Sequence, residues 1–200
     1  MSKEWETSIS IFQDRINNRY FYPINMIIER DGKSIGEGFA ILTLQCSIIE
    51  FLATLEDGMI YRYEADKNKG YYYSKSAKWY NKFLNSADIF EGYFFGAGSF
   101  LKANDFYKDV RCALIHEART RKDWTINIYK KNKALDKKNS ILFEGNKIYR
   151  TALNNALKQY FDEFCEASRQ EDKRGMKYRR YIGRKLDVIE ELEPDKLYWW

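Results

Sequence analysis

The stretch RCALIHEART, residues 111–120, holds the only histidine of this 200-residue chain. His116 stands five positions after Arg111, and two more arginines, Arg119 and Arg121, follow it. A histidine side chain exchanges protons near neutral pH, because its ordinary pKa is about 6.5. An arginine side chain keeps its charge and offers a fork of N–H donors that matches two phosphate oxygens. These residue types suit the cleavage of a phosphodiester.

Cutting RNA without a metal ion needs a base for the ribose 2′-OH, an acid for the 5′ leaving oxygen and positive charge on the phosphorane. One histidine cannot comfortably act as both acid and base in one step. In a two-fold dimer, two copies of this helix can present two histidines and two arginines to one phosphate. A lone histidine is therefore sufficient if the protein forms a homodimer through the motif helix. With RNA as the partner, the product should be a 2′,3′-cyclic phosphate, and DNA should be spared because it lacks the 2′-OH.

A structural role for His116 stays open beside this one. A cationic side chain at the end of a helix is favoured by the helix dipole, and short patterns such as Arg-x4-His also arise by chance. A five-residue offset turns about 140° around an α-helix, so the two side chains do not share one narrow face. Convergence requires the reach of Arg111, a loosened helix near His116, or two copies across a dyad.

The elements that must position these residues are predicted to be mainly helices. Apolar residues recur at helical spacing in several stretches, at residues 4–18, 36–57, 77–92, 104–118, 153–164 and 172–192. Residues 21–32 are expected to be extended, and the tyrosine-rich residues 59–74 are expected to pack as a hairpin. The terminal LYWW is expected to pack on the body of the domain.

A change of pattern after Lys122 predicts a small β element. WTINIYK alternates as a strand does, and ILFEGNKIYR predicts a hairpin that turns at Glu144-Gly145-Asn146. We therefore expect a single domain over residues 1–200. Its fold class is mainly α, an up-and-down helical bundle with a small β-hairpin insertion around residues 124–150 and a basic C-terminal helix at about 172–192.

Arg111 and His116 lie late in a helical chain, and a central helix that carries Glu50 precedes them. This arrangement resembles the HEPN superfamily over roughly residues 35–170. These small helical domains carry an Arg-x4–6-His signature, and many members look like metal-independent ribonucleases that act as dimers. The resemblance implies that Arg111 and His116 are the catalytic pair. It also implies a toxin or antiphage defence effector, with a neutralising protein as a further partner.

Two positions depart from the family pattern. Cys112 stands where the family often has Asn, Asp or His, and it lies one helical turn from His116. A thiol orients an imidazole less firmly than an amide or a carboxylate does, which puts the catalytic power in doubt. Ala118 replaces the tyrosine of a toxin subgroup, so regulation by modification of that tyrosine is not supported.

Other residues are candidates for supporting roles. The central helix carries a polar stripe that comprises Thr43, Ser47, Glu50 and Thr54. This stripe faces either the solvent or the motif helix. In the second case Ser47 and Glu50 would support the catalytic pair. The basic segment 169–185 either binds RNA or forms a solvated helix balanced by the acids at 187–195. The candidate RNA-binding residues are Arg119, Arg121, Lys177, Arg179, Arg180 and Arg184.

The composition narrows the partners. The formal charge of +5 is uneven, because residues 1–100 carry −2 and residues 101–200 carry +7, which favours an anionic partner. Three scattered cysteines indicate neither a disulfide framework nor, without a CxxC or HxxxH pair, a zinc site. No cofactor is expected, although a magnesium site made of carboxylates stays open. With no expected membrane span or signal peptide, a cytoplasmic protein is the default.

Two other functions remain open at this point. The first is a non-catalytic helical module that binds RNA, a nucleotide or a protein partner, and Cys112 at the motif is its best support. The second is a purely structural dimerisation domain.

Overall fold

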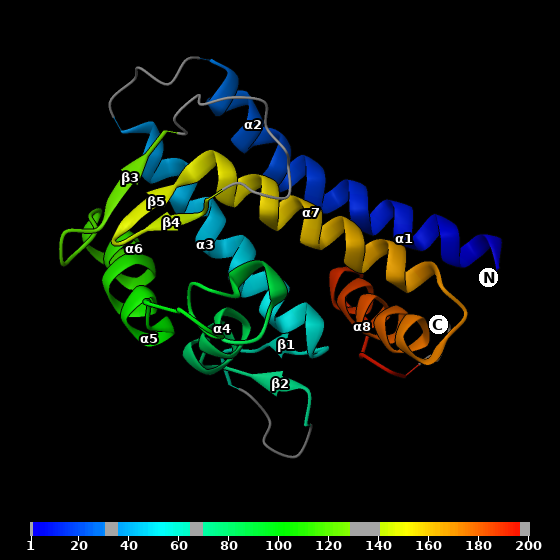
Figure 1. The fold of residues 1–200 in the computed structure, drawn as a ribbon. Helices are drawn as coiled ribbons and strands as arrows, with labels where there is room; N and C mark the ends of the chain where they lie inside the picture. Colours follow the sequence, from blue (N-terminus) through cyan, green and yellow to red (C-terminus); the bar gives the residue numbers. More distant parts are fainter. Residues whose placement is uncertain (1, 31–35, 65–69, 129–140, 197–200) are drawn as a thin grey trace.

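The computed structural model describes residues 2–30, 36–64, 70–128 and 141–196, and it shows a mainly α-helical bundle with two small sheets (Figure 1). Helix α3 (Glu37–Glu56) runs through the centre. Its buried residues lie on several sides because it packs against α4 (Ala77–Leu84), α7 (Arg150–Arg169) and α8 (Lys173–Ile189). The predicted fold class and central helix are confirmed.

The N-terminal part is helical throughout, so the predicted extended chain at residues 21–32 is wrong. Helix α1 (Lys3–Ile16) continues through the π-helical turn η1 (Asn17–Phe21) into α2 (Tyr22–Glu29). Pro23 lacks an N–H group and normally disrupts a continuing helix. The wider π-helical turn directly before α2 accommodates this proline, and Figure 1 shows the two helices in one line.

The tyrosine-rich segment pairs in a different way from the prediction. Strands β1 (Ile60–Tyr61) and β2 (Tyr72–Tyr73) are parallel, whereas a hairpin would have made them antiparallel. Helix α4 then ends at Leu84, earlier than expected, and a 3-10 turn η2 (Asp88–Phe90) follows it. Ser76 stands before α4 but does not cap it with its side chain.

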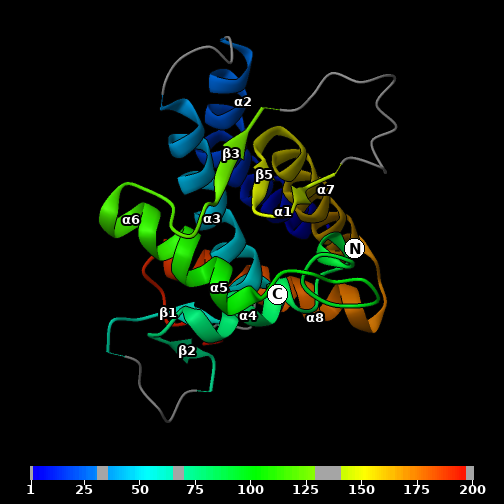
Figure 2. The ribbon, with the colours of Figure 1, turned by 60° about the vertical axis from the view of Figure 1, so that its left-hand side comes forward.

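The motif lies on a helix of three parts: α5 (Ala103–Phe106), the π-helical stretch η3 (Tyr107–Cys112) and α6 (Ala113–Glu117). Phe106 and Val110 are fully buried and hold this helix on the core. Figures 1 and 2 both show α6 at the side of the bundle. Ala118 ends α6 with a φ of 53°. Arg111 therefore lies in the π-helical part and His116 in the last α-helical turn.

The predicted β insertion is confirmed, with the hairpin and the strand that WTINIYK predicts. Strands β4 (Phe143–Glu144) and β5 (Lys147–Tyr149) form the antiparallel hairpin, and Gly145 supplies the turn with a φ of 54°. Strand β3 (Thr125–Asn127) pairs with β5 in parallel. Figure 2 shows β3 beside the start of α3. The terminal LYWW lies outside the described residues.

Within the described residues, α3 alone is long and apolar enough to cross a membrane by length and composition. More than half of the residues in its apolar window are buried inside the bundle, as in the core helix of a folded domain.

Candidate site around Arg111 and His116

Arg111 is held by an ion pair with the central helix. Its Nη2 donates to Oε2 of Glu50 over 2.7 Å, and both side chains are about four-fifths buried. Burial by itself disfavours the charged guanidinium, but the hydrogen bond and charge of Glu50 outweigh this effect and raise the pKa of Arg111. The guanidinium is therefore always charged and fixed in direction.

A polar cluster lies behind this ion pair. The guanidinium of Arg111 stands 5.4 Å from the centre of the Tyr107 ring, and the Tyr107 hydroxyl is 2.9 Å from Oγ of Ser76 on the approach to α4. Burial raises the pKa of Tyr107, with a contribution from a hydrogen bond to Cys112. The thiol of Cys112 thus lies beside Tyr107 and Arg111. Sequence reasoning did not assign Tyr107 or Ser76 to this site, and the signal for Tyr107 was its place beside other aromatic residues.

His116 is exposed and differs from Arg111 in its surroundings. No hydrogen bond to its ring is formed by the part of the chain that the structure describes. Its neighbour Ile115 is also exposed. The π-helical turn ends at Cys112, so α-helical geometry governs most of the offset between Arg111 and His116. In one chain Arg111 faces α3 and His116 faces solvent, and the structure shows no contact between the two side chains.

The arginines after the motif are tied to an acid. Glu117 receives hydrogen bonds from Arg119 and Arg121, which lower the pKa of its carboxyl. The backbone N–H of Arg121 donates to the carbonyl oxygen of Asp109 over 2.8 Å, and the Asp109 carboxylate pairs with Lys122 over 2.9 Å. These contacts fix the turn and partly neutralise the two candidate RNA-binding residues.

The polar stripe on α3 divides between two environments. Glu50 faces the motif helix, as one of the two predictions had it. Ser47 instead donates to the carbonyl oxygen of Thr43 within α3 over 3.1 Å. Thr54 is buried and contacts Lys185 of α8. Within this stripe, Glu50 belongs to the candidate site because it accepts the hydrogen bond from Arg111.

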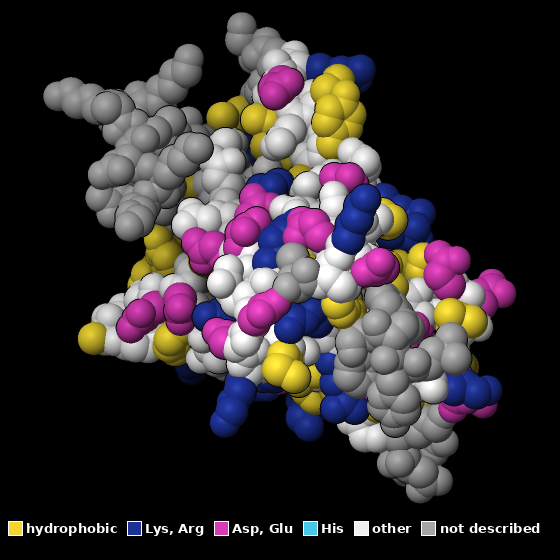
Figure 3. All heavy atoms as spheres, turned by 90° about the vertical axis from the view of Figure 1, so that its right-hand side faces the viewer, with side chains coloured by type: hydrophobic (Ala, Val, Ile, Leu, Met, Phe, Trp, Pro, Cys, Tyr) yellow, Lys and Arg dark blue, Asp and Glu magenta, His cyan; other side chains and the backbone are white. Residues whose placement is uncertain are grey.

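The basic segment is largely occupied by internal contacts. Arg184 is buried and bonds Asp195 and the carbonyl oxygen of Gly58, so it is unavailable to RNA and the prediction for it is corrected. Arg180 also pairs with Asp195. Arg179 donates to carbonyl oxygens at the end of α7. Lys and Arg are interspersed with Asp and Glu on the face shown in Figure 3, without one continuous basic surface there.

Two lysines of α8 complete this description. Lys177 is exposed beside the ring of Tyr181 and keeps its predicted role as a candidate contact to RNA. The ammonium group of Lys185 donates to Thr54 and to the carbonyl oxygen of Met59. Burial lowers the pKa of Lys185 to about 7.

Metal ligation gains no support from the side-chain arrangement. Among the residues that the structure describes, no three His, Cys, Asp or Glu side chains are grouped so that they could hold a metal ion.

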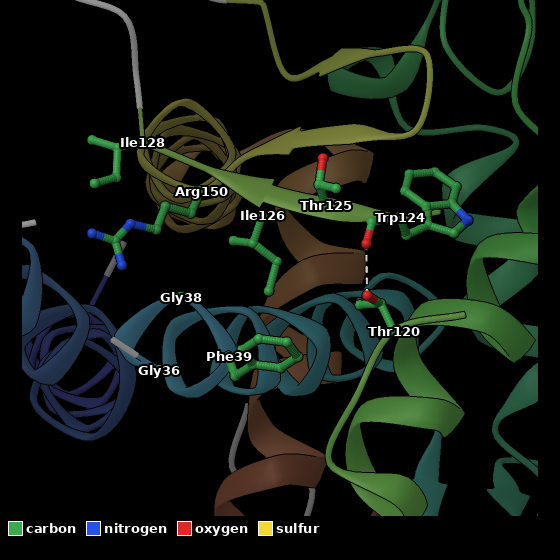
Figure 4. A pocket seen from close by; sticks show the side chains of 9 residues that line it. All are labelled: Gly36, Gly38, Phe39, Thr120, Trp124, Thr125, Ile126, Ile128 and Arg150. Atoms are coloured by element: carbon green, nitrogen blue, oxygen red, sulfur yellow. Dashed lines mark hydrogen bonds between the residues drawn. The ribbon is translucent and has the colours of Figure 1, made fainter. Parts of the chain in front are cut away.

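A cavity that sequence reasoning missed lies close to the motif, between α3, β3 and the turn that ends at Trp124 (Figure 4). Arg150, the first residue of α7, extends into it. The sequence signal for this cavity was a single arginine at the junction between a strand and a helix.

No protein-family model, curated protein or solved structure matches the chain, so these comparisons neither support nor oppose the HEPN resemblance.

Proposed function

We propose that this protein is a homodimeric endoribonuclease that cleaves RNA without a metal ion, with Arg111 and His116 as its catalytic residues. The ribose 2′-oxygen attacks phosphorus while one neutral His116 takes its proton. The bond to the 5′-oxygen breaks as the charged His116 of the partner subunit gives that oxygen a proton. The products are a 2′,3′-cyclic phosphate and a 5′-hydroxyl, and the two histidines have exchanged protonation states.

The observation that carries the proposal is the ion pair between Arg111 and Glu50. A guanidinium that is oriented before the substrate binds stabilises charge on a phosphorane without reorganising in the reaction. Glu50 occupies one of its nitrogens, and about one fifth of the Arg111 side chain stays exposed, which leaves donors for phosphate oxygens. Glu50 is thus a positioning residue and does not touch the substrate.

The exposure of His116 supports the dimer in this proposal. An imidazole at the surface, beside exposed Ile115, suits a contact between two copies of α6 across a dyad. Arg119, Arg121 and Lys177 would then hold the RNA backbone after exchanging part of their internal contacts for phosphate. A toxin or antiphage effector acting in the cytoplasm, with a protein that neutralises it by covering this surface, is the biological role that the HEPN resemblance suggests.

The test is an RNA cleavage assay in EDTA with the full chain and its variants His116→Ala and Arg111→Ala. Both variants should lose cleavage by at least about 100-fold, the effect expected of a general acid or base and of a charge-stabilising donor. Arg19→Gln removes an exposed arginine of η1, outside the basic segment, and should cleave as the wild type does. Wild-type cleavage that requires a divalent cation, or full activity in His116→Ala, would contradict the proposal.

A second function has an observation of its own. Glu50 and Glu117 pair with the arginines in and after the motif, so these arginines carry less free positive charge for a reacting phosphate. This arrangement favours a binding surface over a catalytic one. A non-catalytic module would bind single-stranded RNA in a salt-dependent way and leave it intact. Binding without cleavage by a folded dimer would select this function.

A further inference from the structure

The cavity near the motif has a volume of about 350 Å³ and combines apolar walls with one buried cation (Figure 4). Its apolar walls come from three elements and comprise Phe39, Trp124, Ile126 and Ile128. Thr120 closes one side, where its hydroxyl donates to the carbonyl oxygen of Trp124 over 2.6 Å. The volume is near the lower end of the range that small-molecule sites occupy.

Arg150 is the unusual residue of this cavity. It is only 4% exposed, and its Nε has no hydrogen-bond partner in the structure described. No ion pair or side-chain hydrogen bond joins its guanidinium to the rest of the described chain. A buried charge without a partner is costly and is normally paired or ligated. The contact that fixes the residue is made by its carbonyl oxygen, which accepts from Gln45 over 2.6 Å.

The guanidinium lies over the first turn of α3. Figure 4 shows Arg150 reaching toward Gly36 and Gly38, and its Nη1 would be 3.9 Å from a Cβ atom built on Gly38. The start of a helix carries partial positive charge and free N–H groups. Gly36 stands at the cap position of α3 without a side-chain cap, and the N–H groups of Glu37 and Gly38 have no acceptor in the described ranges. Two sources of positive charge therefore face each other. The one acid of this turn, Glu37, has a buried Oε2 that bonds neither of them within the described residues.

We propose that this cavity binds a small aromatic phosphomonoester, with its phosphate between the Arg150 guanidinium and the first turn of α3 and its ring against Phe39 and Ile126. The fork of Arg150 can bond two phosphate oxygens, and the free N–H groups of α3 can bond the third. A carboxylate has one oxygen fewer and one charge fewer, so it leaves donors unsatisfied. Glycine at position 38 keeps the approach to the first turn open. A Cβ atom there would lie 3.1 Å from the side chain of Ile126 and would narrow the space in front of Arg150.

This site is separate from the proposed RNA cleavage and does not depend on it. It takes no part in the proton transfers by His116. Its nearness to Thr120 makes it a place where a bound ligand stabilises the turn after the motif.

Calorimetric titration of the full chain with phenyl phosphate, inorganic phosphate, phenol and benzoate tests the proposal. Phenyl phosphate should bind tightest, because it alone has both the ring and the dianion. Arg150→Gln should weaken its binding about 10- to 100-fold, the loss expected for a hydrogen-bonded charge pair. Arg174→Gln makes the same charge change at an exposed position and should leave binding unchanged.

Three results would overturn the proposal: no binding of phenyl phosphate to the wild type, equal loss in Arg150→Gln and Arg174→Gln, or tighter binding of benzoate than of phenyl phosphate. Should Arg150→Gln fail to fold, Arg150→Lys keeps the charge but loses the fork, and it should still bind several-fold more weakly than the wild type. Wild-type affinity in Arg150→Lys would show that the fork has no role. The results of the RNA cleavage assay with His116→Ala and Arg111→Ala do not affect these binding outcomes.

Discussion

Removing either partner of the Arg111–Glu50 ion pair should destabilise the fold and show strong coupling between the two residues. At 2.7 Å and an effective dielectric constant of 20, the gross attraction is about 6 kcal/mol. Desolvation of two side chains that are four-fifths buried offsets much of it. We therefore expect Glu50→Gln and Arg111→Gln each to lower the free energy of unfolding by about 2–4 kcal/mol.

The assay is urea unfolding of the wild type, both single variants and the double variant. The double variant should lose less than the sum of the single losses, with a coupling energy of about 1–3 kcal/mol. The pair of Lys82 with Asp57 is a matched control. Its charged atoms lie 2.6 Å apart, close to the 2.7 Å of the first pair, but more than half of the lysine side chain is in solvent. Its coupling should be at most about 1 kcal/mol and should weaken in salt. Equal coupling in the two cycles would refute the reasoning.

Two further predictions concern stability. Gly58→Ala should lower the free energy of unfolding by about 2–5 kcal/mol, because Gly58 has a φ of 62° and a Cβ atom there would overlap the ring of Tyr181. Gly92 also has a positive φ but open space around it, so thermal unfolding of Gly92→Ala should show a smaller loss of stability. Equal losses in the two variants would show that the contact with Tyr181 has no effect. The folded pKa of Lys185 is about 7 against an ordinary value of 10.5, so the unfolded chain gains a proton first as pH falls and stability should decrease from about pH 10.5 to pH 7 and then level off. Lys185→Met should flatten this profile in denaturant titrations, by less than the ceiling of about 5 kcal/mol because the ammonium has two hydrogen-bond acceptors; an unchanged profile would contradict the burial of this charge.

The sequence predicted the elements whose apolar pattern is long. Helix α3 and the hairpin of β4 and β5 follow from periodicity and turn residues, and the structure has both. The helix around Pro23 was missed because a proline normally ends a helix, whereas here a π-helical turn precedes it. The parallel pairing of β1 with β2 was missed because two-residue strands carry almost no periodic signal.

The candidate site was predictable only in part, since residue types do not reveal partners. Glu50 was singled out as an acid on an apolar helix, and the structure brings it to Arg111. The basic stretch before residue 186 suggested a surface for RNA, but Arg184 is used inside the fold. Arg150 had no pattern around it, because the groups that surround it come from α3 and β3, far away in the chain.

The most direct test of the central claim is the chemical nature of the RNA ends after incubation with the full chain in EDTA at neutral pH. The proposed mechanism predicts a 2′,3′-cyclic phosphate and a 5′-hydroxyl, and no cleavage where a single 2′-deoxy nucleotide replaces the attacking ribose. His116→Ala that is folded and dimeric should produce neither end. A 5′-phosphate product, or cleavage at the 2′-deoxy position, would contradict the account.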